Sequence, residues 1–554
     1  MLLAQKKYLW IAISILMQLC ICMFAGTCKK SFFCDEIYSY GLANSKSYTF
    51  IDPKSAEQYD HTGWVNEEYF KQYIEVGRSD SFSLDAAIKN QEQDVHPPFY
   101  YVLLYIVCFL FRGSFSKWTG LGLNYVILVL TDLILLYIAS YIFSDIKKQL
   151  CVMMVWSCSA AGLSNILFIR MYLLLTCEML AFAAIHVRVL RKKGSVDFEI
   201  RDNILLLLCV AIGGLTHYYF YPFVFFFSGC ICIYLLVRKQ IAALIKYTGF
   251  LLGGFLLALA VFPGTIRHLQ EGYRVSEVLK NLSGREENVY AIYLHWADQA
   301  ALGGCFKMLV LVFAAIMIWI AVNRYFFSFR ILFDDVMKSF ILRIKKVKRK
   351  WTDSYYLHLN LPVVFILLLL IAFAGFGIIA VKGSQIKHNR YIYPLYPMIA
   401  LLFVCTASFC IRQLAVKKHE GKILYVISIW ICLCSIRTYG IDFMYSDYEV
   451  FQDQAEQVRG NDCLLLYGDH WLDTYTALPL KQIYNETYFL HPSEIGELPR
   501  ILRSRKTVDP VVVCLPDAYS NEDANKILVQ IEEAGGYKGH HMVYHYYTQA
   551  YLLE

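Results

Sequence analysis

The sequence predicts an α-helical polytopic membrane protein that carries a small C-terminal α/β domain. Of its 554 residues, 57% are hydrophobic, 16% aromatic and only 18% charged, and the mean hydropathy is +0.43. These values exclude an ordinary soluble enzyme of this length. Apolar segments of about 20 residues, the length that one helix needs to cross a bilayer, recur up to residue 440. Residues 441–554 are polar and contain short β-type runs instead.

We expect about 11–13 transmembrane helices, because each crossing requires roughly 20 mainly apolar residues. The first segment ends in Ala25-Gly26-Thr27, a poor cleavage site, and is therefore expected to be an uncleaved anchor. The candidate segments are 8–27, 97–112, 119–143, 150–168, 171–190, 203–221, 222–237, 242–262, 303–323, 360–381, 393–411 and 422–440.

Clusters of Lys and Arg predict which loops face the cytoplasm. The basic loops are Lys6-Lys7, Arg191-Lys192-Lys193, Arg238-Lys239, the run from Arg343 to Lys350, and Lys417-Lys418. The remaining loops, 28–96, 263–302 and 382–392, are then extracytoplasmic, as is the tail. Twelve crossings would return the tail to the cytoplasm, so the short segment 97–112 is expected to be re-entrant or to merge with its neighbour.

Two domains follow from this pattern: a transmembrane domain over 1–440, with 28–96 as its first outer loop, and an extracytoplasmic domain over 441–554. In the second domain, residues 463–467 and 511–515 read as strands and 521–533 as an amphipathic helix. No Gly-rich phosphate loop is evident. We therefore interpret this domain as a lid or docking module rather than a second catalytic centre.

Two adjacent carboxylates, Asp35 and Glu36, lie just beyond the first apolar segment. Ionisable groups at such a boundary are costly because lipid does not solvate them, and they are commonly functional. This pair predicts an active site at the membrane surface.

Other polar residues are expected on the same face, although each has a simple alternative explanation. An arginine can extend to the interface, tyrosines are common at helix ends, and a histidine can be buried and satisfied. Their coincidence on one face is what favours a site. These residues are Asp94, His96, Arg170, Tyr172, His217, Tyr218, Lys387, His388, Arg390 and Tyr391.

This set suits the transfer of a sugar from a lipid phosphate to an acceptor. A carboxylate, either Asp35 or Glu36, would take the acceptor proton, and cations would stabilise the departing phosphate. Lys387, His388 and Arg390 are candidates for the cations, and Arg offers a planar fork for phosphate oxygens.

The chain resembles the GT-C superfamily of polytopic glycosyltransferases, which includes protein O-mannosyltransferases and aminoarabinose transferases. The resemblance covers roughly residues 1–440 and rests on several motifs in order. They are Asp35-Glu36, His96-Pro97-Pro98-Phe99-Tyr100-Tyr101, Arg170-Met171-Tyr172, Thr216-His217-Tyr218, and Arg390-Tyr391-Ile392-Tyr393-Pro394-Leu395-Tyr396-Pro397. The resemblance implies a polyprenyl-phosphate sugar donor, inversion at the sugar carbon, and the first carboxylate of the pair as the base. The additional lumenal repeat domains of a typical eukaryotic mannosyltransferase are not evident in this sequence, which favours a bacterial enzyme.

The expected partners are a polyprenyl-phosphate sugar donor, membrane lipid and an acceptor of unknown kind, with no nucleic acid. No cofactor is expected. A divalent metal held by Asp35, Glu36, Asp94, His96 or His217 is the less favoured option, because no tight metal motif is present. We expect a multi-pass protein of the plasma membrane with its site on the extracytoplasmic face. The alternative is a transporter or lipid flippase, which would bind near the midplane; a non-catalytic scaffold ranks third.

Overall fold

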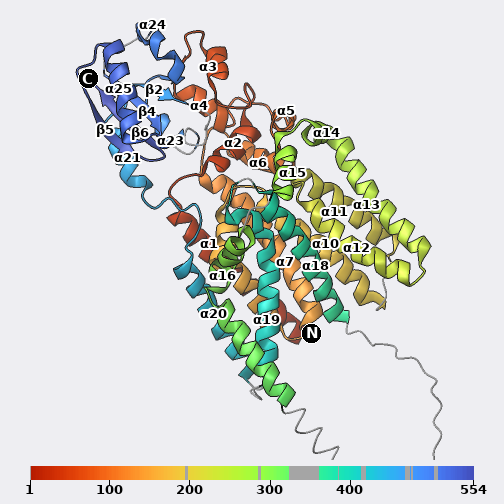
Figure 1. Cartoon of the computed structure of the whole chain (residues 1–554). Coiled ribbons are helices and arrows are strands. Elements are labelled where there is room, and N and C mark those ends of the chain that lie inside the picture. The colour runs from red at the N-terminus through yellow and green to blue at the C-terminus, as the bar shows by residue number, and fades with distance from the viewer. Residues whose placement is uncertain are drawn as a thin grey trace, which may run out of the picture.

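The computed structural model of the chain is a long helical bundle with a small sheet domain at one end (Figure 1). It describes residues 2–193, 198–284, 288–322, 361–384, 386–413, 419–467, 475, 478–504 and 510–554. The N-terminus lies toward the end of the bundle opposite the sheet domain. The expected basic loops at 343–350 and 417–418 lie outside the described residues.

Within these ranges, eight helices are long and apolar enough to cross a membrane, so the polytopic prediction is confirmed. Two further pairs of helices pass the same test together but are bent. The single helices are α1 (Leu2–Cys28), α7 (Lys117–Ile142), α10 (Tyr172–Lys193), α12 (Phe220–Val237), α13 (Ile241–Val261), α18 (Leu361–Gly383), α19 (Tyr396–Gln413) and α20 (Glu420–Thr438).

The bent pairs replace two of the expected straight segments. Helix α8 (Ile146–Ser157) meets α9 (Ala160–Leu167) at 63°, and α16 (Val289–Leu302) meets a helix at Phe306–Val322 at 82°. The segment expected at 203–221 is α11 (Ile200–Thr216), which has His217 as its C-cap.

The expected exception at 97–112 is a short helix, α6 (Phe99–Leu110), of 12 residues. A helix of that length rises only about 18 Å, less than the roughly 30 Å hydrocarbon core. The chain that follows the helix also lies beside the first large loop, residues 28–96, because the Gly113 N–H donates to the Val76 carbonyl at 2.7 Å. The helix therefore begins and ends at the same side of the bundle, as a re-entrant segment does.

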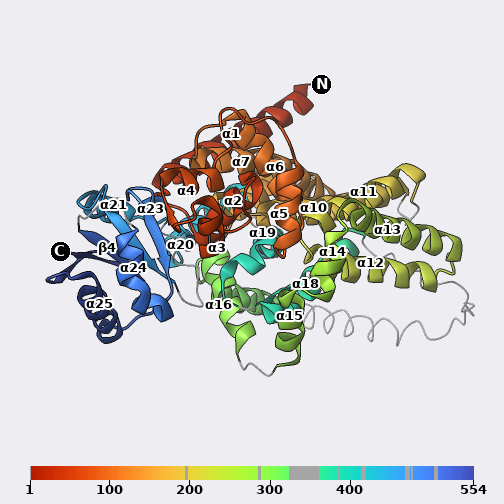
Figure 2. The same cartoon turned by 90° about the horizontal axis from the view of Figure 1, so that it is seen from above.

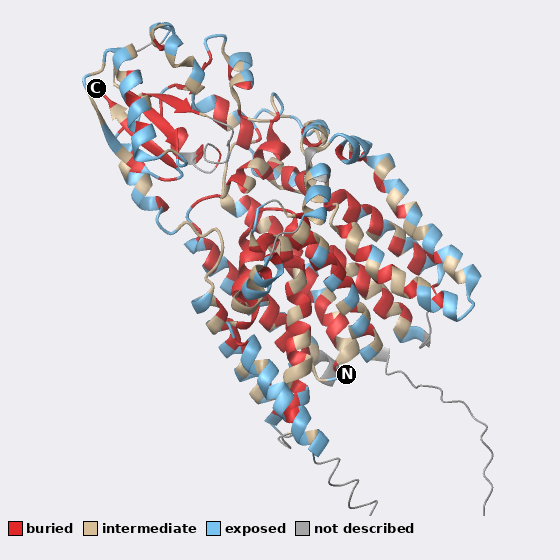
Figure 3. Ribbon diagram, in the orientation of Figure 1, coloured by how far each residue is buried: buried red, intermediate tan, exposed pale blue. Residues whose placement is uncertain are grey.

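Long apolar side chains are exposed along the outside of the bundle, while its interior is buried (Figure 3). Phe225 is 72% exposed and Leu252 is 58% exposed, on α12 and α13. In water such a surface would be costly, whereas lipid solvates it.

Five short elements between α1 and α6 cover the end of the bundle that lies opposite the N-terminus (Figure 2). They are α2 (Cys34–Asn44), α3 (Pro53–Tyr59), β1 (Trp64–Val65), α4 (Glu67–Ile74) and α5 (Asp85–Gln93). Helices α14 (Gly264–Gln270) and α15 (Tyr273–Ser283) join them at the same end. The short 3-10 helix η1 (Asn389–Leu395) leads into α19.

The C-terminal sheet has the strand order β1-β3-β2-β4-β6-β5. The strands expected near 463 and 511 are β2 (Asp462–Leu466) and β4 (Val511–Pro516), which pair in parallel. The others are β3 (Thr487–Leu490), β5 (His540–His545) and β6 (Thr548–Leu553), and the helices of this domain are α21 (Tyr448–Glu456), α23 (Leu478–Lys481), η3 (Pro492–Glu497), α24 (Leu498–Arg503) and α25 (Asn521–Gly535).

One strand of this sheet comes from the first large loop. β1 pairs antiparallel with β3, with Trp64 opposite Tyr488. The sheet is thus completed by residues about 400 positions earlier in the chain, and it ties the loop that carries Asp35 and Glu36 to the C-terminal domain.

Candidate functional site

A cavity of about 300 Å³ opens at the end of the bundle and collects most of the predicted polar residues. Its walls come from segments that are distant in sequence but meet at the same end of the helices. The predicted residues that line it are Asp35, His96, Arg170, Tyr172, His217, Tyr218, Arg390 and Tyr391.

The centre of the cavity is an ion pair between Asp35 and Arg390. Asp35 lies in the first turn of α2, and its Oδ2 is 2.5 Å from Nη1 of Arg390. Arg390 is buried on η1, where its own N–H donates to Nδ1 of His388 at 3.1 Å. The Asp35 side chain is still 18% exposed, so this carboxylate reaches the cavity.

A second arginine fixes the start of α2. Nη1 of Arg170 donates to the Asp35 carbonyl at 3.0 Å and to the Ser39 hydroxyl at 3.2 Å. Its guanidinium also lies 5.7 Å from the centre of the Tyr101 ring. Arg170 precedes α10 in the break after α9, so it can reach sideways to α2. The cavity is thus lined by two arginines, Arg170 and Arg390.

Two histidines form another wall. Nδ1 of His96 lies 2.9 Å from Oδ2 of Asp94, and the rings of His96 and His217 are 5.7 Å apart. Burial alone would raise the pKa of the Asp94 carboxyl, but His96 and Arg170 outweigh it and hold that pKa below its ordinary value. Asp94 therefore stays ionised, and its contact with Nδ1 orients the His96 ring, although Asp94 itself does not line the cavity.

His217 is a neutral member of the site. Burial, together with His96 and Arg170, holds its pKa well below the ordinary value. Its Nδ1 accepts the Tyr219 N–H at 3.0 Å, which places the ring proton on Nε2. His217 can then donate one hydrogen bond but carries no charge at neutral pH.

Tyrosines complete the lining. The ring of Tyr172 lies 5.8 Å from that of His217 and 6.3 Å from that of Tyr391. The Tyr218 hydroxyl lies 2.8 Å from Nδ1 of His268. Hydroxyls and ring faces beside the arginines suit a ligand with both polar and apolar parts.

Glu36 lies outside the cavity, unlike its neighbour Asp35. It is fully buried, and its Oε2 lies 2.9 Å from Nζ of Lys29. The same carboxylate accepts the Phe33 N–H at 2.7 Å and the Ile169 N–H at 2.9 Å. This is the capping position N3 of α2. All these contacts give Glu36 a structural role in the fold, so the expectation that it is an alternative base is not supported by its position.

The predicted cations at 387 and 388 are separated from the cavity lining. Lys387 is exposed, and His388 lines a neighbouring cleft instead. Burial and the adjacent Arg390 lower the pKa of His388 to about 4, so it is neutral at pH 7. Of the three predicted phosphate-binding groups, Arg390 alone lines the cavity.

The structure adds residues that the sequence did not single out. Glu277 on α15 and Ser384 line the cavity, and His268 on α14 supports Tyr218. None of these residues belongs to a motif. Helices α14 and α15 bring His268 to Tyr218 and Glu277 to the cavity, and Ser384 reaches the cavity directly after the end of α18. Among the described residues, no group of three or more His, Cys, Asp or Glu side chains is arranged to hold a metal ion.

Comparison with solved structures defines the class of fold. The crystal structure of ArnT from Cupriavidus metallidurans bound to undecaprenyl phosphate matches this chain with a TM-score of 0.54 at 10% identity, covering 98% of each chain. The apo structure of the same protein matches with a TM-score of 0.53 at 11% identity, covering 98% of this chain and 97% of ArnT. No protein-family model and no curated protein matches the sequence.

The match extends over the transmembrane bundle and the C-terminal domain together, so this chain has the polytopic GT-C fold of ArnT along almost its whole length. The fold expected from the motifs is thereby confirmed.

Proposed function

We propose that the protein is a membrane glycosyltransferase that moves a sugar from a polyprenyl-phosphate donor to an extracytoplasmic acceptor. The observation that carries this proposal is the cavity in which Asp35 and Arg390 face each other at the end of a bundle with the fold of ArnT. ArnT was crystallised with undecaprenyl phosphate, which makes a lipid phosphate the natural ligand to test first.

In this proposal Arg390 binds the donor phosphate. The guanidinium has five N–H donors in a planar fork, and a phosphate oxygen can use the same positions that Asp35 now occupies. Arg170 adds a second positive charge to the same cavity. Together they stabilise the charge that develops on the phosphate as the sugar leaves.

Asp35 then acts as the general base. Once the donor phosphate binds Arg390, the Asp35 carboxylate no longer pairs with that arginine. It accepts the proton of the acceptor hydroxyl or amine while that group attacks the sugar carbon. The bond from this carbon to the phosphate oxygen breaks, and polyprenyl phosphate leaves with inversion at carbon. Base catalysis of this kind contributes typically ~10²–10⁴ in rate.

The neutral His217 and the tyrosines bind the sugar in this mechanism. His217 donates from Nε2, and ring faces of Tyr172 and Tyr391 line the same cavity. No step requires a metal. The site faces the extracytoplasmic side, where the donor is used after its carrier lipid has been flipped.

The experiment is to incubate the purified protein in detergent with polyprenyl-phosphate sugars and an envelope extract. Free polyprenyl phosphate and the new glycoconjugate are measured by mass spectrometry. We expect both to appear together. A transporter or flippase would leave the sugar–phosphate bond intact, and that outcome would refute the proposed function.

A further inference from the structure

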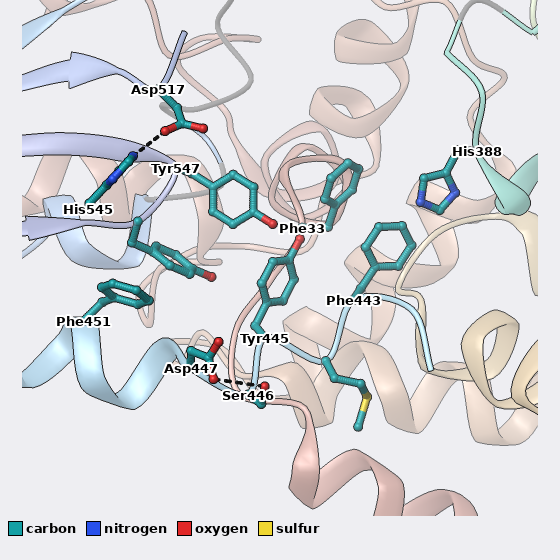
Figure 4. A pocket seen from close by; sticks show the side chains of 12 residues that line it. Phe33, His388, Phe443, Tyr445, Ser446, Asp447, Phe451, Asp517, His545 and Tyr547 are labelled. Carbon is teal, nitrogen blue, oxygen red and sulfur yellow. Dashed lines mark hydrogen bonds and ion pairs between the residues drawn. The ribbon is translucent and has the colours of Figure 1, made fainter. Parts of the chain in front are cut away.

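A larger cleft, of about 680 Å³, lies between the bundle and the C-terminal domain (Figure 4). Phe33 and His388 contribute from the bundle, and residues 443–447 contribute from the segment between α20 and α21. Phe451 of α21 and Asp517, His545 and Tyr547 contribute from the C-terminal domain. Its size is within the range of ligand pockets, commonly about 300–1,000 Å³. The mechanism proposed above makes no use of this cleft.

Aromatic rings dominate the walls of the cleft. The His388 ring stacks on Phe443 with centroids 4.9 Å apart and an angle of 8° between the planes, and Phe33 lies 4.6 Å from Phe443. On the opposite side, Tyr547 lies 5.0 Å from Tyr546. Figure 4 shows Phe33, His388, Phe443 and Tyr547 among the side chains that line the cleft.

The backbone of the cleft is strained where it presents these rings. Among the described residues, five that are not glycine have a positive φ, and three of them line this cleft: Phe443 at 61°, Tyr445 at 52° and Tyr547 at 50°. Bulky residues rarely adopt this conformation, and such strain concentrates at ligand-binding sites. The chain therefore holds aromatic side chains here against their local preference.

Hydrogen-bonding groups alternate with the rings. Oδ1 of Asp517 pairs with Nε2 of His545 at 2.5 Å, and the Ser446 hydroxyl lies 3.3 Å from Asp447. Carboxylates accept hydrogen bonds from hydroxyls, and ring faces pack against apolar C–H surfaces. A pyranose ring presents both features, with hydroxyls at its edge and C–H groups on its faces.

We infer that this cleft binds a sugar ring of the acceptor, so that the acceptor of the proposed glycosyltransferase is itself a glycoconjugate. This inference rests on the proposed function. The cleft adjoins the reaction site, because Arg390 lies 5.5 Å above the Phe33 ring and pairs with Asp35. Phe33, which lines the cleft, is separated from Asp35 by one residue in sequence and contacts the arginine that pairs with it. The C-terminal domain supplies the outer wall, which gives the domain a role in acceptor binding.

The test is saturation-transfer NMR on the full-length protein in nanodiscs. The probes are methyl β-glucopyranoside, methyl α-mannopyranoside and methyl N-acetyl-β-glucosaminide. Sorbitol is the control, since it has hydroxyls but no ring face. We expect saturation of the C–H face of at least one pyranoside and none of sorbitol. A glycolipid in the nanodisc, compared with a soluble trisaccharide, distinguishes a membrane-anchored acceptor from a free glycan.

Variants locate the binding. Phe443→Leu and Tyr547→Leu should weaken pyranoside binding by about tenfold or more, as removal of a central aromatic contact does, whereas Phe443→Tyr should retain it. Tyr547 is 39% exposed, so Tyr547→Leu is the variant least able to disturb folding. Phe82→Leu, at an exposed ring outside the cleft, is the matched control and should bind as the unaltered protein does.

Binding that survives both leucine variants, or saturation of a Ser/Thr peptide in place of the pyranosides, would overturn the inference. The two proposals fail separately. Pyranoside binding without donor cleavage would refute the proposed function and leave the cleft as a sugar-binding site, whereas donor cleavage without pyranoside binding would refute the acceptor cleft alone.

Discussion

Asp35 and Glu36 are chemically similar neighbours that the fold uses differently. Successive residues of a helix are about 100° apart around its axis, so one carboxylate points into the cavity and the next points into the protein interior. The sequence identified the pair but left both as candidate bases. Only the contacts of Glu36 with Lys29, Phe33 and Ile169 separate the two.

The Glu36→Gln variant tests this separation. It leaves Lys29 buried without its counter-charge, and breaking a buried pair typically costs about 3–5 kcal/mol. We expect a lower melting temperature but near-normal turnover per folded molecule. The double variant Lys29→Met with Glu36→Gln should recover part of the stability. A loss of turnover of about 10²-fold at unchanged melting temperature would instead make Glu36 a base.

His388 predicts a specific dependence of stability on pH. Its pKa falls from the usual 6.5 to about 4 in the folded protein, chiefly through burial. Between these values the unfolded state binds more protons, so stability is lost as the pH falls from about 6.5 through about 4. His388→Phe keeps the stacking on Phe443 without the titration. Its melting temperature in detergent should therefore fall less over this interval than that of the unaltered protein; equal slopes would contradict the assignment.

Among the elements, the helices were predictable and the smallest strand was not. Apolar length reveals a crossing helix directly, and the parity of the basic loops already marked 97–112 as the exception. β1 has only two residues, Trp64 and Val65, and no alternating pattern marks it. Its partner strand lies so far along the chain that pairing is a property of the whole fold.

Trp64→Ala tests the connection that β1 makes. Trp64 is 2% exposed, and its Nε1 donates to Ser504 at 3.1 Å. Removing a buried Trp side chain typically costs about 3–5 kcal/mol. We expect faster hydrogen exchange in β3 and easier proteolysis of the C-terminal domain. Trp118→Ala, at a ring that is 41% exposed on the bundle, should leave both unchanged. Unchanged exchange in β3 of Trp64→Ala would show that β1 is dispensable.

At the scale of the whole molecule, the loops that carry the site meet because successive crossing helices run in opposite directions. Alternate loops therefore lie on the same side of the bundle. The sequence named twelve candidate site residues, and eight of them line the cavity, since motifs at helix ends on one face converge. It did not predict Glu277 or the aromatic cleft, because these depend on how 263–302 and the C-terminal domain fold back over the bundle.

Sidedness is tested by cysteine labelling in intact cells. Ser79 lies in an exposed part of the first large loop, Ser520 is exposed in the C-terminal domain, and Gln240 is exposed between α12 and α13. A cysteine introduced at Ser79 or Ser520 should react with an impermeant maleimide in intact cells. Its labelling should exceed the background labelling of the unaltered protein, which comes from the native cysteines. The cysteine at Gln240 should react only in opened membranes. Labelling of Gln240 and protection of Ser79 in intact cells would invert the proposed topology.

The central claim is that Arg390 holds the donor phosphate while Asp35 accepts the acceptor proton. It is tested most directly by measuring polyprenyl-phosphate binding and sugar transfer separately in two variants. Asp35→Asn should bind polyprenyl phosphate at least as tightly as the unaltered protein, because the competing carboxylate is gone, and should lose about 10²–10⁴ in turnover. Arg390→Lys should lose binding as well as turnover, because a point charge does not replace the planar fork. Near-normal transfer by folded Asp35→Asn, or unchanged lipid binding by Arg390→Lys, would contradict the account.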